Sequence, residues 1–262
     1  MLAAAGIASR RAAETWIRAG RVSVDGVDAQ IGDRADPNQQ TISVDGRPLA
    51  FERPAYWILH KPKSVLTTTS DPHGRPTVLG LLPPEAPRVF PVGRLDWETE
   101  GLVLLTNDGD VAHALLHPSL GSEREYHVFV RGRIPDSVLG RLARGVVLED
   151  GPTAPARVGA ARFDRGTDTS VFPLVLVEGR KRQIRRAMDA LGHPVRRLVR
   201  VRMGPIELGT LGPGRARSLR QAEIAMLREH ASSRQPAGTR ASQVPAAGRK
   251  APTGSRKTHR RS

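Results

Sequence analysis

The sequence predicts an α+β protein with a small N-terminal unit, a larger mixed unit and a basic C-terminal tail. Short helical patterns and Asp-Gly hairpin turns fill the first fifty residues. Apolar strand patterns then alternate with a few helical ones from Trp57 onward, and core residues cease near Ser232. The predicted boundaries are 1–48 for the small unit, 49–55 for a linker, 56–230 for the larger unit and 231–262 for a tail without stable structure.

Composition excludes several classes of protein. The 262 residues suffice for one large and one small domain. Cysteine is absent, which excludes disulfides, a thiol nucleophile and a cysteine-based zinc site. No apolar run approaches the roughly 20 residues that span a bilayer. Arginines follow the short apolar N-terminus where a signal peptide would be cleaved, so we expect a cytoplasmic location and no membrane partner.

The net charge of +15 is unevenly distributed along the chain. Residues 1–50 balance six arginines with six acids, whereas 178–220 hold twelve Lys/Arg against three acids. Residues 232–262 hold eight Lys/Arg and no acid. Such basic blocks suit a polyphosphate partner, because each phosphate contact releases counterions. A merely solubilising surface is the alternative, and it fits the tail better than 178–220, where basic and apolar residues interleave.

The small unit reads as helix, turn, helix and hairpin. Ser9 is a suitable N-cap for a helix that Gly20 ends. One face of that helix is apolar, and Asp25-Gly26 and Asp45-Gly46 are hairpin turns. The apolar face comprises Ala12, Ala13, Trp16 and Ile17, and the basic residues off it are Arg10, Arg11, Arg18 and Arg21.

The larger unit contains short strands and two clear helices. The pattern predicts a helix over 111–117, with Asp110 as its cap and Pro118 beyond its end, and a second helix over 180–192. The predicted strands are 57–59, 102–105, 123–132, 171–179 and the alternating 196–208.

One arginine and three carboxylates precede the buried strand 102–105: Arg94, Asp96, Glu98 and Glu100. An acid held in a loop at the end of a rigid strand is well placed to face a cleft. The common alternative is an aspartate that bonds its own turn. Paired carboxylates such as Glu98 and Glu100 also occur in glycosidases, but neighbours in one loop rarely face each other across a bond, so we expect solvated loop acids.

His113 and His117 have the spacing of helical metal ligands. With no cysteine nearby, a surface or partly buried pair is the favoured interpretation, and no metal site is predicted.

The segment AGIASRRAAETWIRAGRVSVDG resembles the S4 RNA-binding domain. The shared features are the arginines after a Gly-x-x-Ser helix start and the Gly-Arg-Val entry to a strand. A generic helical hairpin is the alternative, since short motifs match by chance.

The segment VGRLDWETEGLVLLTNDG resembles the catalytic motif of pseudouridine synthases of the small-ribosomal-subunit (RsuA-like) type. Three further stretches agree in order: LHKPKSVLTTTSDPHGRPTV, EREYHVFVRG and EGRKRQIRRAMDALGHPVRRLVRVRMGPIEL. The resemblance implies a mixed, mainly antiparallel sheet with flanking helices and a central cleft. It also implies isomerisation of a uridine in ribosomal RNA, by a monomer without metal or organic cofactor.

The resemblance assigns the catalytic role to Asp96, which either attacks C1′ or removes a proton from the sugar. It makes Arg185 the ion-pair partner of Asp96, Arg94 a contact to the RNA backbone, and Tyr126 a stacking partner of the flipped base. Two positions depart from the family pattern: Arg124 replaces a common lysine and Lys181 a common asparagine. The predicted RNA-binding residues are Arg10, Arg11, Arg18, Arg21, Arg180, Lys181, Arg182, Arg186, Arg197 and Arg200.

The target could be the large or the small ribosomal subunit, as free RNA or as a pre-ribosomal particle. A basic tail after this domain resembles the large-subunit (RluB-like) branch, which we favour. Two other hypotheses remain: a non-catalytic S4-type RNA-binding protein, and an N-glycosylase that flips and releases a base.

Overall fold

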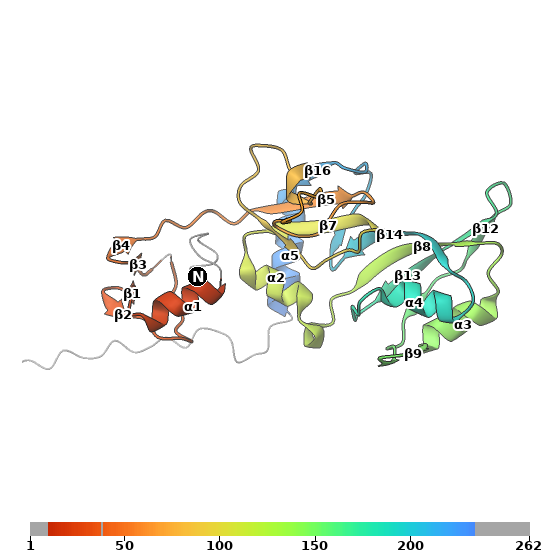
Figure 1. The fold of residues 1–262 in the computed structure, drawn as a ribbon, viewed down its shortest axis with the longest axis horizontal. Coiled ribbons are helices and arrows are strands. Elements are labelled where there is room, and N and C mark those ends of the chain that lie inside the picture. The colour runs from red at the N-terminus through yellow and green to blue at the C-terminus, as the bar shows by residue number, and fades with distance from the viewer. Residues whose placement is uncertain (1–9, 38, 234–262) are drawn as a thin grey trace, which may run out of the picture.

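The computed structural model describes residues 10–37 and 39–233, which form a small unit and a large one (Figure 1). In the small unit, helix α1 (Arg10–Arg18) packs on a sheet of order β2-β1-β3-β4. Its core contains Ala13, Val22, Ile42 and Val44, and Trp16 and Ile17 pack against them. The strands are β1 (Val22–Val24), β2 (Val27–Asp28), β3 (Ile42–Val44) and β4 (Arg47–Pro48).

Both predicted Asp-Gly turns are confirmed. Asp25 and Gly26 have φ of 51° and 82°, and Asp45 and Gly46 have φ of 49° and 74°. Two successive positive φ angles make a type I′ turn, whose twist matches that of the strands it joins. The predicted first helix and the Ser9 cap lie outside the described residues.

A mixed, mainly antiparallel sheet forms the centre of the large unit, as expected. Its order is β11-β13-β8-β14-β7-β5-β16. Three further strands pair with members of this series: β12 with β13, β15 with β14 and β6 with β7. All pairs are antiparallel except β14 with β7. The strands are β5 (Tyr56–Lys61), β6 (Phe90–Val92), β7 (Glu100–Thr106), β8 (Arg124–Arg131), β11 (Arg157–Val158), β12 (Arg162–Asp164), β13 (Thr169–Leu176), β14 (Val195–Met203), β15 (Ile206–Glu207) and β16 (Ala216–Ser218); β9 (Val147–Leu148) and β10 (Gly151–Pro152) pair separately.

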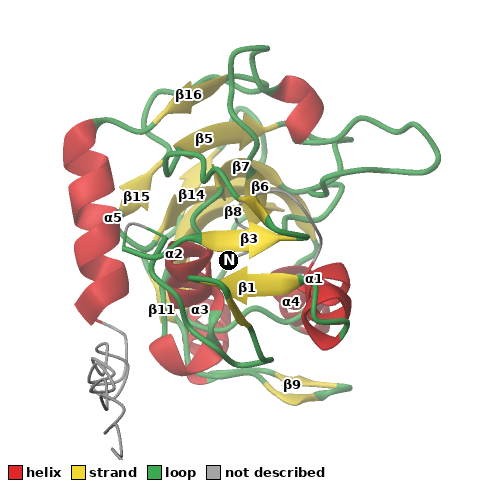
Figure 2. Cartoon of the chain, turned by 90° about the vertical axis from the view of Figure 1, so that its left-hand side faces the viewer, coloured by secondary structure: helices red, strands yellow, loops and turns green. Residues whose placement is uncertain are grey.

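Helices cover each half of this sheet (Figures 1 and 2). Helices α2 (Gly109–Leu116) and α5 (Gln221–Ser233) pack with β5 and β7 in one core cluster. Helices α3 (Asp136–Arg144) and α4 (Gln183–Ala190) pack with β8 and β13 in a second. Two 3₁₀ turns, η1 (Leu79–Leu81) and η2 (Pro118–Leu120), complete the elements. No helix of the described ranges is long and apolar enough to cross a membrane.

Three local predictions need correction. Asp108, not Asp110, caps α2, because its side chain accepts from the backbone N–H groups of Asp110 and Val111. Burial does not alternate along β14: residues 198–200 are buried in succession, between two shifts of its register against β8. Residues 231–233 of the predicted tail are the last turn of α5, with Ala231 buried; the rest of the tail lies outside the described residues.

Candidate active site

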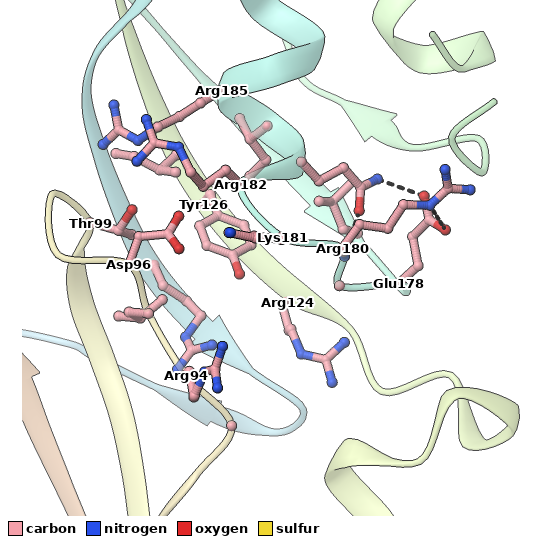
Figure 3. A pocket seen from close by; sticks show the side chains of 18 of the residues that line it. Arg94, Asp96, Thr99, Arg124, Tyr126, Glu178, Arg180, Lys181, Arg182 and Arg185 are labelled. Carbon is pink, nitrogen blue, oxygen red and sulfur yellow. Dashed lines mark hydrogen bonds and ion pairs between the residues drawn. The ribbon is translucent and has the colours of Figure 1, made fainter. Parts of the chain in front are cut away.

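A pocket of about 640 Å³ opens between the two halves of the sheet (Figure 3). The loop before β7 supplies Asp96 to its wall, and β8 supplies Arg124 and Tyr126. The segment from β13 into α4 supplies the opposite side, and Arg200 comes from β14. The residues predicted for catalysis from separate stretches of the chain therefore meet: Arg94, Asp96, Tyr126 and Arg185.

A pair of hydrogen bonds and a glycine fix the loop that carries Asp96. The Thr67 hydroxyl accepts from the Leu95 N–H at 3.2 Å and donates to the Leu95 carbonyl at 3.0 Å. Gly101 has φ of 109°, and a Cβ there would stand 2.2 Å from the Arg200 carbonyl oxygen. Only glycine allows β7 to approach β14 this closely, which brings the Asp96 loop against the rest of the pocket.

Lys61, at the end of β5, lies under the same loop and is fully buried. Its ammonium donates to the carbonyl oxygens of Pro62 and Thr99, both at 2.8 Å, and of Trp97 at 3.4 Å. Burial lowers the pKa of Lys61 to about 8, against the opposing effect of Asp96, Glu100 and Glu98. The sequence motifs did not single out Lys61, although a lysine that ends an apolar strand before proline is a visible signal.

Loss of the Lys61 proton should lower activity above pH 8. Protonation is complete well below the pKa and falls to about a tenth one unit above it. The neutral amine has fewer donors for the three loop carbonyls and no charge to attract Asp96. We expect the pH–rate profile of the wild type to fall through about pH 8.

The Lys61→Met variant should be slower and should lack that alkaline limb, as measured by single-turnover conversion of RNA between about pH 6 and 9, which brackets the pKa of the lysine. An unchanged limb in Lys61→Met would assign it to another group.

Arg185 extends from α4 to the Asp96 loop, but the predicted ion pair is not formed between these two described residues. Its Nη2 donates to the Glu98 carbonyl at 3.1 Å and its Nη1 to the Val195 carbonyl at 3.1 Å. Burial lowers the pKa of Arg185, as does Arg182, while the charges of Asp96 and Glu98 raise it. Arg185 thus holds the backbone of the loop and adds positive charge near Asp96 without a direct bond to its carboxylate.

Tyr126 and Arg124 lie on one face of β8, two residues apart. Tyr126 is half-buried and packs against the cores of both halves of the sheet. Arg124 donates to the carbonyl oxygens of Leu115 at 3.0 Å and Val177 at 3.4 Å, and burial lowers its pKa. The longer, forked arginine therefore braces two loops at the pocket wall, a task a lysine cannot reproduce. Arg94 is exposed at the rim.

The predicted RNA-binding residues of segment 180–186 divide into two groups. Arg180 and Arg186 are engaged by the β9–β10 hairpin: Arg186 holds Asp150 through two 3.0 Å bonds, and Arg180 donates to three carbonyls there. Lys181 and Arg182 are exposed and line the pocket. These last two are the better placed to contact a phosphate, and the contact itself stays a prediction.

Pairing with Glu100 changes the interpretation of Arg197, and burial changes that of Arg200. Arg197 makes two 3.0 Å bonds to Glu100 and lies over the Phe129 ring at 5.4 Å. Arg200 is only 2% exposed, so the predicted contact with a surface phosphate is not available to it.

The small unit presents some of its predicted arginines to solvent. Arg21 is paired with Asp45 and stacks on Trp16 at 4.9 Å. Arg18 lies 3.8 Å from Glu14, and Arg11 is exposed. Arg10 begins α1. RNA binding by this set stays a prediction.

The prediction of solvated loop acids is right for Glu98 and wrong for Glu100. Glu98 is exposed, whereas Glu100 is the buried first residue of β7. Burial by itself would raise the pKa of Glu100. The hydrogen bond and the charge of Arg197 lower it by more, so the pKa of this carboxyl lies below its usual value. His113 and His117 form an exposed ring pair 4.9 Å apart, as predicted. Within the described chain, no three His, Asp or Glu side chains gather as a metal site.

Comparisons with known proteins agree on one family. A family model for RNA pseudouridylate synthase matches residues 55–190, and one for the S4 domain matches residues 1–40. The large-subunit pseudouridine synthase B of Bacillus subtilis is 40% identical over 229 residues, 87% of this chain and 93% of the relative. An uncharacterised RNA pseudouridine synthase of Aquifex aeolicus is 42% identical over 86% of this chain and 91% of its own. A crystal structure of a pseudouridylate synthase superposes with a TM-score of 0.61 at 31% identity, covering 86% of this chain and 96% of the other.

Proposed function

This chain belongs to the RNA pseudouridylate synthase family, and on that premise we propose that it converts one uridine of large-subunit ribosomal RNA to pseudouridine, with Asp96 as the catalytic carboxylate. The S4 domain and the synthase domain both support an RNA substrate. The observation that carries the proposal is the pocket itself: one half-buried aspartate, on a loop braced by Lys61 and Arg185, faces an aromatic ring with arginines around the rim.

The pocket has room and groups for each step of the reaction. The uridine leaves its stack at a cost of a few kcal/mol and enters between Asp96 and Tyr126. Asp96 attacks C1′ or removes a sugar proton, the N1–C1′ bond breaks, and C5 of the turned base joins C1′. The overall change gains and loses no atoms or electrons, so the proposal includes no metal or organic cofactor. The residues named for these steps all lie on one chain, and the proposed enzyme is a monomer.

Mass spectrometry of a target RNA distinguishes isomerisation from base release. The proposal predicts an RNA of unchanged mass whose uridine becomes reactive to carbodiimide. An RNA lighter by one uracil, with free uracil in solution, would make the protein an N-glycosylase. RNA binding without either change would make it a non-catalytic S4-type protein.

The large subunit is proposed because the curated relatives from Bacillus subtilis and Pseudomonas aeruginosa, at 40% and 42% identity, are named for it. Incubation with large- and small-subunit RNA transcripts separates the two targets. Conversion only in the small-subunit transcript would overturn this part of the proposal and leave the isomerase activity intact.

We expect the aromatic ring of Tyr126, and not its hydroxyl, to hold the flipped base by stacking. We expect Tyr126→Ala to weaken engagement of the flipped base by roughly 1–3 kcal/mol, the usual range for base–aromatic stacking. Tyr126→Phe should retain that engagement and lose only in the chemical step. Single-turnover rates as a function of enzyme concentration measure both effects. Identical curves for the wild type and Tyr126→Ala would remove Tyr126 from the substrate site.

Deletion of residues 234–262 should weaken RNA binding without redirecting the reaction. The deleted segment contains all eight Lys/Arg of the basic tail and no acid, and such charges bind phosphates irrespective of sequence. Affinity should therefore fall and its dependence on salt should flatten. The modified uridine should stay the same, as read by carbodiimide mapping of the product. Modification at another uridine would show that the tail selects the target.

A further inference from the structure

Arg200 is a fully buried arginine whose charge is only partly satisfied. Its Nε donates to the Leu102 carbonyl at 2.8 Å, and its Nη2 is buried without a hydrogen-bond partner. No carboxylate of the described residues lies within ion-pair distance of it. An arginine stays protonated in proteins, and an unpaired buried cation is costly. A donor left free in this way is expected to have a partner during function.

The side chain of Arg200 lies in the wall of the active-site pocket. In the pairing of β14 with β8, Arg200 stands directly opposite Tyr126. Residues opposed in an antiparallel pair point to the same face, with Cβ atoms about 4.5–5.5 Å apart. A base that stacks on Tyr126 therefore comes within reach of the Arg200 guanidinium.

The depth of Arg200 favours the base over a phosphate as its partner. The exposed cations at the rim, Arg94, Lys181 and Arg182, are accessible to the RNA backbone. Arg200 is 2% exposed and lies in the pocket wall opposite Tyr126. We expect the flipped nucleotide, and not the RNA backbone, to reach it there. Uracil presents carbonyl oxygens there, which accept from an N–H donor.

We propose that Arg200 is a further catalytic residue, which donates to a carbonyl oxygen of the target uracil and stabilises the negative charge of the detached base. The proposal rests on the proposed function. When the N1–C1′ bond breaks, its electron pair leaves with N1, and the uracil becomes a monoanion whose charge spreads onto its carbonyl oxygens. C1′ is meanwhile either bonded to Asp96 or joined to C2′ by a double bond after C2′ loses a proton to Asp96.

The charge then returns to neutral within the same pocket. C5 bonds to C1′ and loses its proton, and N1 gains a proton. Asp96 leaves C1′ in the first route or returns its proton to C2′ in the second, and in both it ends as the carboxylate it was at the start. A fixed cation in a site with little water acts most strongly on the intermediate that carries the charge. Arg200 thus stabilises a state that neither substrate nor product contains.

The test varies both the cation and the stability of the anion. Arg200→Met and Arg200→Gln remove the charge, and Arg200→Lys keeps it. Each is assayed in single turnover on RNA with uridine or 5-fluorouridine at the target, by the rate at which the N1-linked nucleoside disappears from digests of the RNA. The fluorine stabilises the departing base by itself. It also occupies the C5 position that would lose a proton, so this RNA reports breakage of the N1–C1′ bond and not formation of pseudouridine. We expect both neutral variants to convert uridine on the order of 10²-fold more slowly, the usual loss on removal of one such donor. Their loss on 5-fluorouridine should be several-fold smaller, and Arg200→Lys should retain more activity than either.

Arg202→Met is the matched control, because Arg202 lies on the same strand and bonds Glu123 and Glu125 away from the pocket lining. It should change neither rate by more than a few-fold. Equal losses of rate on the two substrates in a folded neutral variant would overturn the proposal, because a purely structural role of Arg200 would slow both reactions to the same extent. Full activity in Arg200→Met or Arg200→Gln would overturn it as well. A wild type that converts neither RNA would refute the proposed function itself.

Discussion

The Asp96→Asn variant is expected to lose conversion of uridine by roughly 10⁴-fold or more, the scale of loss when an essential catalytic group is removed. Asparagine fits the same loop between Leu95 and Trp97 but can neither attack C1′ nor accept a sugar proton. RNA affinity should stay within a few-fold of the wild type, because phosphate contacts come from Lys and Arg. Carbodiimide mapping and filter binding measure the two quantities on the same RNA.

Glu98→Gln is the control for this result. Glu98 is an exposed acid two residues away, and Arg185 bonds its backbone carbonyl, which the substitution keeps. The variant should keep nearly full activity. Turnover of Asp96→Asn close to that of the wild type would refute the assignment of Asp96.

The Arg185→Ala variant should lose activity even when RNA is saturating. The substitution removes the donor to the Glu98 carbonyl and a positive charge beside Asp96. We expect the rate of the chemical step to fall by about 10²–10³-fold, as on removal of one preorganised electrostatic group. Single-turnover kinetics with enzyme in excess isolate that step.

Arg186→Ala provides the comparison within the same helix turn. Arg186 pairs with Asp150 at a part-exposed site, where such pairs are worth about 0–1 kcal/mol. Its chemical step should match that of the wild type. Recovery of Arg185→Ala by additional RNA would show that Arg185 serves affinity instead of the reaction.

Local patterns were sufficient to predict much of the fold. The two Asp-Gly turns, the buried strand β7 and helix α4 depend on neighbours in the chain. The turns and β7 are found where the pattern predicts them, and α4 begins at Gln183, three residues later than predicted. The position of Asp96 at the mouth of β7 followed from the same pattern. The cap of α2 was misplaced by two residues because Asp108 and Asp110 are equivalent in a propensity argument.

The partners of charged residues could not be predicted from the sequence. Glu100 looked like a loop acid, and only the parallel pairing of β7 with β14 brings Arg197 to it across 97 positions of the chain. Arg200 is buried where β14 pairs with β8 on one side and with β7 on the other, although its basic neighbours in the sequence predict an exposed strand. Burial and pairing of this kind arise from tertiary packing, which a local pattern does not contain.

Carbodiimide mapping of ribosomal RNA from cells that lack this protein tests the proposed activity on its natural substrate. Mapping is repeated after complementation with the wild type and with Asp96→Asn. We predict that one pseudouridine stop in large-subunit RNA disappears on deletion, returns with the wild type and does not return with Asp96→Asn. An unchanged map on deletion would refute the proposed activity, and a stop restored equally by Asp96→Asn would refute the catalytic role of Asp96.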